Sequence, residues 1–426
     1  MIVLLMFLAL VAMVCINVPI AIALSLAAVL GIWLTDGFEA LVTVGIDMYS
    51  GAKSFSLIAI PMFVLAGAIM NATGITRRLI AFVAALIGFV RGGLAMVTIG
   101  VSLFFAEISG SAVADVAAIG SVLIPEMKKR GYSAPFAAAV SSSSASLAII
   151  IPPSIPMILY GVSSGASIQE LFVAGIVPGL LGAAGLMGVA YYFARRYNLP
   201  REEAFNLRRL RETFVSALPA FALPVIILGG IFGGFVTATE GAGLAVVAAI
   251  LVGIWYGEIA WGELKQAMLE GGIQTAVVML LVAASVLMGG YLTAARIPQE
   301  LAAGMLELTS NKYVVLLILN VFFLIIGFFL HSAAAIILVV PIVMPMVLAA
   351  GIDPVHFGLV VTLNLAIGQQ TPPVASVLIT SCSIAKANIW EVSKVNVYFV
   401  AVLLFVLLLC TYVPAVPMFL PDLFYR

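Results

Sequence analysis

The stretch Ala148-Ile149-Ile150-Ile151-Pro152-Pro153-Ser154 sets two adjacent prolines inside strongly apolar sequence. Proline has no backbone N–H and its ring clashes with the preceding helical turn, so a helix cannot run through this stretch unbroken. The carbonyl and amide groups freed by the break are tolerated at membrane depth only where protein or a water-filled site satisfies them. The stretch therefore predicts an interrupted membrane helix beside a buried polar site.

The interrupted helix occurs twice. Adding 220 to the numbering of the first half carries Pro125 onto Pro345 and Pro152-Pro153 onto Pro372-Pro373. Broken helices at corresponding positions of two repeats are the sequence feature that best marks the binding site of a secondary transporter. The chain is therefore predicted to be a transporter built from two copies of one unit.

Composition places the chain in the membrane. Of its 426 residues, 64% are hydrophobic and 9% are charged, against about 45–50% and 25% in soluble proteins. Net charge is zero, which argues against nucleic acid and against a polybasic contact with lipid headgroups. Nothing matches a nucleotide-binding loop, so any pumping is expected to draw on an ion gradient. The three cysteines lack metal or disulfide spacing; they are Cys15, Cys382 and Cys410.

Two apolar segments, 94–125 and 312–346, are too long for one span and too short for two spans with a loop, since a span needs about 20 residues. Small or polar residues interrupt each at its middle, Ser109-Gly110-Ser111 in one and Gly327 to Ser332 in the other. They are expected to be re-entrant hairpins. The other predicted membrane segments are 2–16, 18–34, 55–76, 135–163, 171–194, 214–234, 241–257, 273–294, 355–385 and 396–415. Residues 1–16 lack the positive start of a signal peptide and read as a first membrane segment.

The positive charges predict which loops of the chain lie in the cytoplasm. Short loops rich in Lys and Arg stay in the cytoplasm, and six arginines lie in residues 195–212: Arg195, Arg196, Arg201, Arg208, Arg209 and Arg211. Segments 171–194 and 135–163 each cross the membrane once, so counting back from this loop returns Lys128 to Arg130 to the cytoplasmic face. Arg77, Arg78 and Arg91 lie on that face as well only if 94–125 is re-entrant. The equivalent loops of the second half carry no such charge, which predicts that the repeats are inverted.

The predicted fold is an all-α polytopic membrane protein with inverted repeats, each containing a re-entrant hairpin and a broken helix. Residues 36–54 and 195–213 are the long polar connectors. The expected domains are 1–90, scaffold and arm helices; 91–165, the first transport unit with hairpin 94–125 and broken helix 135–163; 166–308, linker and second scaffold; 309–386, the second transport unit with hairpin 312–346 and broken helix 355–385; and 387–426, a C-terminal scaffold helix.

Neutral oxygens gather at the two breaks. Hydroxyl and carbonyl oxygens suit a monovalent cation, whereas a divalent cation would want carboxylates, so Na⁺ is the expected ion. A simpler role stays open, because serine and glycine also let membrane helices pack closely. The residues concerned are Ser109, Ser111, Ser141 to Ser144, Ser146 and Ala148 to Ser154 in the first copy, and Gly327, Ser332, Asn364 and Gly368 to Val374 in the second.

Ionisable groups inside apolar sequence are costly and usually functional. Asp115 follows Ser111 by one helical turn, and Arg296 could pair with Asp115 or with a substrate carboxylate; an interfacial role for Arg296 is the alternative. His331 could carry a proton or contact substrate, or be a neutral hydrogen-bonded histidine. Glu240 is expected at a helix end.

These residues resemble a known family, the large membrane subunit of TRAP transporters (tripartite ATP-independent periplasmic transporters, DctM-like), over nearly the whole chain. The matching motifs are Ile60 to Gly67, Ser109 to Asp115, Ile149 to Ile155, Thr237 to Glu240 and Gly368 to Pro373. The resemblance implies an elevator-type ion-transporter fold in a bacterial inner membrane, coupling to two or more Na⁺, a small four-helix membrane subunit (DctQ-like) and a periplasmic solute-binding protein (DctP-like) that delivers an organic acid.

The resemblance also implies site residues. One Na⁺ would lie near Ser109, Ser111 and the backbone of Ala148, Ile151 and Pro153, and a second near Gly327, Gly368, Thr371 and Val374. The acid would lie between them, and the candidate substrate residues are Asp115, Arg296, Ser144, Ser146, His331, Asn364, Gln369 and Gln370. Three features depart from the family pattern: Ala148 where glycine is frequent, His331 where an acid is frequent, and Gln369-Gln370 where the pair is usually apolar.

The expected function is Na⁺-driven uptake of a C4-dicarboxylate, sialic acid or sugar acid, without enzymatic activity. The alternative is a stand-alone Na⁺/dicarboxylate symporter. A hydrolase using Ser109 with His331 lacks a supporting motif, and a passive channel lacks a ring-forming filter.

Overall fold

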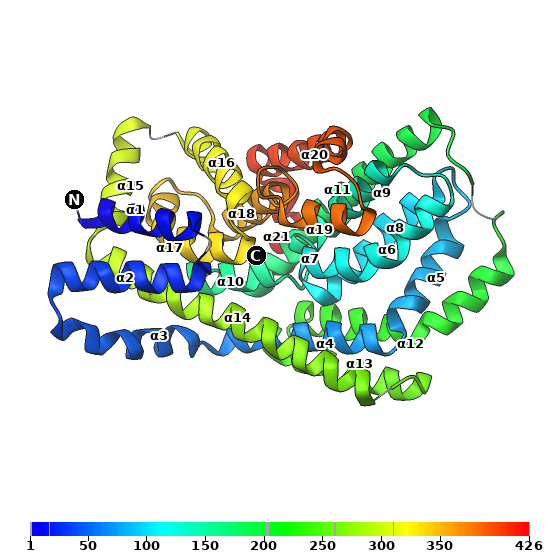
Figure 1. Cartoon of the computed structure of the whole chain (residues 1–426), viewed down its shortest axis with the longest axis horizontal. Helices are drawn as coiled ribbons and strands as arrows, with labels where there is room; N and C mark the ends of the chain where they lie inside the picture. The colour runs from blue at the N-terminus through cyan, green and yellow to red at the C-terminus, as the bar shows by residue number, and fades with distance from the viewer. Residues whose placement is uncertain (1, 17, 202–203, 260, 310, 426) are drawn as a thin grey trace.

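The computed structural model describes residues 2–16, 18–201, 204–259, 261–309 and 311–425. Helices fill this part of the chain, and no β-strand occurs among the described residues. Figure 1 shows most of the long helices, among them α2, α14 and α13, running in one common direction. The all-α prediction is confirmed.

Equivalent elements follow in the same order in the two halves, at an offset of about 220 residues, but α14, α17 and α18 of the second half each replace two or three shorter elements of the first. The first half comprises α1 (Ile2–Cys15), α2 (Ile20–Asp36), η1 (Glu39–Thr43), α3 (Val44–Ala52), η2 (Phe55–Ile58), α4 (Ala59–Ala72), α5 (Ile75–Ile87), α6 (Gly93–Ser109), α7 (Ala112–Asp115), η3 (Val116–Gly120), α8 (Ser121–Lys129), α9 (Ala134–Ala145), η4 (Ser146–Ile149), α10 (Ile155–Ser164) and α11 (Ile168–Arg196). The second comprises α12 (Leu207–Phe232), α13 (Ala238–Tyr256), α14 (Trp261–Ala294), α15 (Ile297–Leu308), α16 (Lys312–Phe329), α17 (Ser332–Ala349), α18 (Pro354–Gly368), α19 (Ser376–Ala385) and α20 (Ile389–Tyr412), followed by α21 (Ala415–Tyr425).

Within the described residues, eight helical stretches are long and apolar enough to cross a membrane. They are Phe55–Ala72, Ile168–Arg196, Leu207–Phe232, Ala238–Tyr256, Leu264–Ala294, Lys312–Phe329, Ser332–Ala349 and Ile389–Tyr412. Two shorter amphipathic helices, α5 and α15, occupy equivalent positions in the repeats and run across the direction of the long helices at opposite ends of the molecule (Figure 1).

Each predicted hairpin turns where the sequence places its small residues. α6 ends at Ser109, Gly110 takes the left-handed conformation (φ 57°), and Ser111 caps the helical run that continues through α8. In the second hairpin α16 ends at Phe329, Leu330 is extended, and His331 caps α17.

Both ends of the first hairpin reach the arginine-rich loop. Before α6, the Gly92 N–H donates to the Pro200 carbonyl at 3.1 Å. After α8, Arg130 lines one cavity together with Arg209 of that loop. The hairpin therefore enters and leaves by one face, as the charge pattern predicts.

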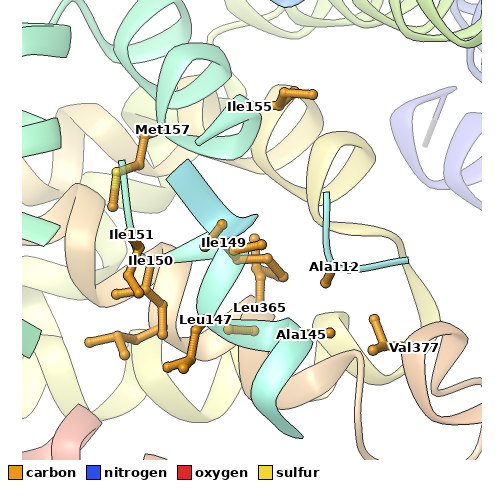
Figure 2. Close-up of a cluster of buried hydrophobic side chains, with 14 of the residues drawn as sticks. Ala112, Ala145, Leu147, Ile149, Ile150, Ile151, Ile155, Met157, Leu365 and Val377 are labelled. Carbon is orange, nitrogen blue, oxygen red and sulfur yellow. The ribbon is translucent and has the colours of Figure 1, made fainter. Parts of the chain in front are cut away.

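The proline pairs interrupt their helices as expected. Between α9–η4 and α10 the chain is non-helical from Ile150 to Ser154, and between α18 and α19 it is non-helical from Gln369 to Ala375. Both Pro–Pro peptide bonds are cis. Figure 2 shows apolar side chains around the first break, with Ile149 close to Leu365 of the second repeat.

Contacts between the repeats are reciprocal. α10 packs on the second hairpin helix α17, and α19 packs on the first hairpin at η3, α7 and α8. Likewise α9 packs on α20, and α18 on α11. When each unit presents the same surfaces to the other, the two are related by a twofold axis. The repeats are thus interlocked about a pseudo-twofold axis, with each broken helix lying against the other repeat's hairpin.

Some boundaries differ from the sequence prediction. The connector 36–54 was expected to be polar loop but contains α3, which packs on α14. α12, α14 and α20 begin before their apolar segments, because polar first turns can extend a membrane helix beyond its apolar part. Glu240 lies at a helix end as expected, where it completes a capping box with Thr237: the Thr237 N–H donates to the carboxylate at 2.8 Å.

Candidate functional site

A cavity of about 380 Å³ lies where the two hairpin tips meet. The two repeats contribute equivalent positions to its wall, which places the cavity on the pseudo-twofold axis. The equivalent pairs are Ser111 with His331, Ala112 with Ser332, and Ile149 with Gln369. α14 supplies the facing wall through Ile273, Gln274 and Val277.

A larger cavity of about 670 Å³ continues from the first. The two share five lining residues, Val64, Ser111, Ala114, Ala117 and Gln274. From there the larger cavity runs between α4, α14 and the first hairpin to Asn71, Thr76 and Arg77. Arg77 has 80% of its side chain exposed and carries the positive charge expected on the cytoplasmic face. The cavity at the tips is therefore connected to the end of the molecule that carries Arg77.

The electrostatics of the smaller cavity come from helix ends. Among the described residues, its wall contains no Asp, Glu, Lys or Arg. Two helical runs start at the cavity: the Ala114 N–H donates to Ser111 Oγ at 3.4 Å, and the Ala333 N–H donates to His331 Nδ1 at 3.4 Å. Helix N-termini carry partial positive charge and attract anions. The arrangement suits a small anion held by peptide dipoles.

At the first predicted ion site the hairpin tip packs directly on the broken helix. A Cβ built on Gly110 would stand 3.0 Å from the Ile155 nitrogen and 3.1 Å from the Pro153 carbonyl oxygen. Only glycine combines this close approach with the left-handed φ. Ser111 is partly buried beside this contact, and Ala148 and Ile151 are buried in the interrupted segment. The side chain of Ser109 lies outside the described residues.

The second predicted ion site is built in the same way. A Cβ built on Gly368 would stand 2.5 Å from the Gly327 Cα, so the backbones of α16 and α18 touch. The Val374 N–H donates to the Phe328 carbonyl at 3.2 Å, and the Thr371 hydroxyl donates to the Ile367 carbonyl at 2.9 Å. The second tip therefore combines a main-chain contact that leaves no room for a side chain with a hydroxyl oxygen on Thr371 in the break.

Three predicted substrate residues lie in helix contacts away from the cavity wall. Ser144 Oγ accepts from Ser102 Oγ at 3.1 Å and donates to the Ser141 carbonyl at 3.1 Å. Ser146 Oγ donates to the Ser142 carbonyl at 3.2 Å. Asn364 Nδ2 donates to Asn320 Oδ1 at 2.6 Å, and Asn320 in turn donates to Thr411. Ser144 and Asn364 thus join neighbouring helices, as small polar residues often do in membranes, whereas the Ser146 bond stays within its own helical run.

The predicted pairing of Asp115 with Arg296 does not occur. Asp115 is fully buried in the first hairpin. Arg296 is exposed, with φ 58°, at the turn between α14 and α15. The cavity contacts α14 as far as Val278, and the sixteen residues from there to Ala294 correspond to about 24 Å of helix. Figure 1 shows the α14–α15 turn far from α7. The structure therefore does not bring Arg296 to Asp115 or to the cavity.

His331 and Gln369 do line the cavity. Gln370 does not; its backbone carbonyl accepts from Asn396 Nδ2 at 3.1 Å and its side chain donates to the Ala366 carbonyl at 3.4 Å. Sequence reasoning missed Gln274, Asn71 and Arg77. Gln274 could have been recognised from the sequence, because it is a polar residue near the start of the apolar segment 273–294.

Ion pairs lie at the Arg77 end of the larger cavity. Arg78 donates to both Glu258 carboxylate oxygens, at 3.1 and 2.9 Å, and stacks 3.8 Å from the centre of the Tyr256 ring. Arg77 approaches the same carboxylate at 3.5 Å. The hydrogen bond from Arg78 lowers the pKa of Glu258 below its ordinary value. Helix α5 is thereby tied to the loop between α13 and α14.

Known proteins resemble the chain along nearly its whole length. The "Isethionate TRAP transporter permease protein DctMQ" of Oleidesulfovibrio alaskensis is 42% identical over 406 residues, covering 95% of the chain and 64% of that relative. The "C4-dicarboxylate TRAP transporter large permease protein DctM" of Pseudomonas aeruginosa is 37% identical over 89% of each chain. The "2,3-diketo-L-gulonate TRAP transporter large permease protein YiaN" of Escherichia coli is 37% identical over 94% of each.

One solved structure shares the fold. The YdaH transporter of Alcanivorax borkumensis, whose crystal structure is described as having "an unusual topology", superposes with a TM-score of 0.64 over 89% of each chain at 16% identity. The family model of the tripartite ATP-independent periplasmic transporter, DctM component, matches residues 7–416. The resemblance read from the sequence is thus confirmed: the chain belongs to the DctM family of TRAP transporter membrane subunits and is a multi-pass transport protein, not an enzyme.

Proposed function

We propose that this chain is the large subunit of a Na⁺-coupled TRAP transporter that imports a small organic acid across a bacterial inner membrane. The observation that carries the proposal is the cavity on the pseudo-twofold axis, bounded by both hairpin tips and continuous with a path to Arg77. Paired broken helices about such an axis are the architecture of alternating access.

An organic acid fits the electrostatics of the cavity. Two helix N-termini start at its wall, while the wall itself lacks charged side chains among the described residues. Peptide dipoles stabilise a carboxylate or sulfonate without a fixed counter-charge that would hold it too tightly for release. The relatives are named for isethionate, a C4-dicarboxylate and 2,3-diketo-L-gulonate, all organic anions.

Sodium fits the two clusters of neutral oxygen at the tips. Na⁺ is cargo here, moved together with the acid. At the second tip the Gly327 and Gly368 backbones are in direct contact, and Thr371 in the following break carries a hydroxyl oxygen. The Gly110 contact with the Pro153 carbonyl is the counterpart in the first repeat. Neutral oxygens of this kind suit a monovalent hard cation.

The cavities divide the molecule into a moving part and a fixed part. One wall consists of the hairpin tips and breaks, and the other of α4 and α14. Sliding the hairpins and broken helices along that second wall would carry the acid from one face to the other, which is the elevator mechanism. In this arrangement the path to Arg77 is the open one and corresponds to the inward-facing state, with loop 195–212 in the cytoplasm.

The proposed partners are a small four-helix membrane subunit and a periplasmic solute-binding protein. The family name, which describes a tripartite and periplasmic transporter, supports both. The alternative, a stand-alone Na⁺/dicarboxylate symporter, needs neither.

Uptake assays test the proposal. Cells that express the chain with its neighbouring transporter genes are given radiolabelled isethionate, succinate or 2,3-diketo-L-gulonate in NaCl or in choline chloride. We expect accumulation of at least one acid in Na⁺ only, and its loss when the binding-protein gene is deleted. Accumulation that persists after that deletion would favour the symporter, and accumulation equal in choline would refute Na⁺ coupling.

A further inference from the structure

The smaller cavity has two chemically different faces. At equivalent positions the first repeat places Ile149 and the second places Gln369. Ile149 belongs to the apolar cluster around the first break (Figure 2), and Ile155 and Val113 extend that face along the cavity. From its hairpin tip and its break, the second repeat contributes the polar residues Gln369, His331 and Ser332 beside Ala333. A symmetric architecture thus encloses an asymmetric site.

Gln369 holds a hydrogen-bond donor that the protein does not use. The residue is 98% buried, since only 2% of its surface is exposed, and it lines the cavity. Its Oε1 accepts from the Ser376 hydroxyl at 3.5 Å. Nε2 has no hydrogen-bond partner among the described residues. A buried donor left unpaired is unfavourable, so a ligand that pairs with it gains affinity.

His331 adds a second donor on the same face. Its Nδ1 accepts the Ala333 N–H, so in the neutral imidazole the proton lies on Nε2. The residue is exposed to the cavity. The polar face thus offers N–H groups, while Ile149, Ile155 and Val113 of the first repeat offer only C–H surface.

Resting on the proposed function, we propose that Gln369 selects acids that carry a second oxygen, such as a hydroxyl, carbonyl or further acidic oxygen, a few carbons from the charged group. The charged group lies at the helix N-termini of the hairpins, the second oxygen accepts from Gln369 Nε2, and the carbon chain lies against Ile149 and Ile155. Simple alkanoates leave the Gln369 donor unpaired and bind weakly. A site that hydrogen-bonds its substrate rejects analogues without the partner atom far more strongly than an apolar pocket rejects a methylene.

Gln370 provides the matched control. It is the adjacent residue, fully buried and of identical chemistry, and one of its side-chain atoms also lacks a partner, yet it does not line the cavity. A general effect of removing a buried amide near the break would appear at both positions. An effect on ligand choice is expected at Gln369 alone.

The experiment measures thermal stabilisation of the purified full-length protein in NaCl by a matched pair of acids, 3-hydroxypropionate and propionate. The wild type is expected to bind 3-hydroxypropionate more tightly. Gln369→Met, which keeps an unbranched side chain without the donor, is expected to reduce that preference about tenfold, with Gln369→Leu as a second variant. Gln370→Met should keep the preference. Stabilisation by NaCl over choline chloride shows that each variant is folded.

The possible outcomes distinguish failure of the Gln369 assignment from failure of the proposed function. If the wild type binds both acids in Na⁺ and Gln369→Met retains the full preference for 3-hydroxypropionate, the assignment of Gln369 is wrong while the proposed function stands. An equal loss of preference in Gln370→Met would also overturn the assignment of Gln369. If neither acid nor succinate stabilises the wild type, and Na⁺ has no effect, the proposed function fails and this inference with it.

Discussion

The Gly368 and Gly327 backbones touch, so that a Cβ added to Gly368 would stand 2.5 Å from both Cα and C of Gly327. The contact joins the second hairpin to its broken helix at the proposed ion cluster. Because both atoms belong to the main chain, neither can rotate away, and a side chain at 368 must push the two helices apart.

Gly368→Ala is therefore expected to destabilise the protein by about 1–3 kcal/mol, the range for overpacking, and to weaken stabilisation by Na⁺. Thermal unfolding in NaCl and in choline chloride measures both effects. Gly243→Ala is the control, since a Cβ there meets nothing within 4 Å and alanine favours the helix. Unchanged Na⁺ stabilisation in Gly368→Ala would show that the contact is not part of an ion site.

Thr371 is predicted to supply a hydroxyl oxygen to the second Na⁺. Thr371→Val keeps the shape and should raise the Na⁺ concentration for half-maximal uptake at least tenfold, as expected for a lost contact to a charged group. Thr380→Val is the control, because Thr380 makes the same bond to the carbonyl four residues earlier, Ser376, but lies within α19. Equal Na⁺ dependence in the two variants would remove Thr371 from the site.

Arg296 is expected to be dispensable for substrate affinity. It lies exposed at the turn after α14, away from the cavity, so Arg296→Ala should leave the KM for the transported acid within about twofold of the wild type. Uptake kinetics in Na⁺ measure this. A large rise in KM would indicate that Arg296 meets the substrate when the hairpins occupy their other position.

The Arg78–Glu258 pair gives a pH-dependent contribution to stability. Since the pKa of Glu258 is lowered from its ordinary 4.5 by the Arg78 hydrogen bond, the contribution is present above pH 4.5 and is lost as pH falls through the lowered pKa. Glu258→Gln should therefore lower the melting temperature more at pH 7 than at pH 3. The carboxylate side chain is 34% exposed, so the effect should stay near 1 kcal/mol.

Glu212→Gln is the control for this pair. The Arg208–Glu212 pair has the same 2.9 Å distance, but its side chains are 89% and 63% exposed. Exposed pairs contribute little, so no measurable change is expected at either pH. An equal loss of stability in both variants would show that burial of the Arg78 pair has no role.

Much of the fold could be predicted from the sequence because its signals are local. Proline pairs break helices wherever they lie, and Gly110 marks a turn by its conformation. Because the sequence pattern repeats at an offset of 220 residues, the elements of the second half could then be predicted from those of the first. α3 could not be predicted in the same way, because its stretch is too polar to stand out and is held as a helix partly by packing on α14.

The site could be predicted only in part. Ser111, His331 and Gln369 follow from their positions at a tip or a break. Gln369 and Gln370 are adjacent and identical, and in a non-helical segment no periodicity tells which one faces the cavity. Asp115 and Arg296 were paired by charge, but charge does not specify distance, and the length of α14 separates them.

The central claim is that the hairpin tips enclose a water-filled, Na⁺-sensitive site open to the cytoplasm. The most direct test is labelling of Ala117→Cys, which lines both cavities, by a membrane-impermeant maleimide in inside-out vesicles. Val225→Cys, 70% exposed on a spanning helix, is the lipid-facing control. We predict that Ala117→Cys is labelled, that Na⁺ but not choline changes the rate, and that Val225→Cys is not labelled. No labelling of Ala117→Cys from either face, or equal rates in Na⁺ and choline, would contradict the account.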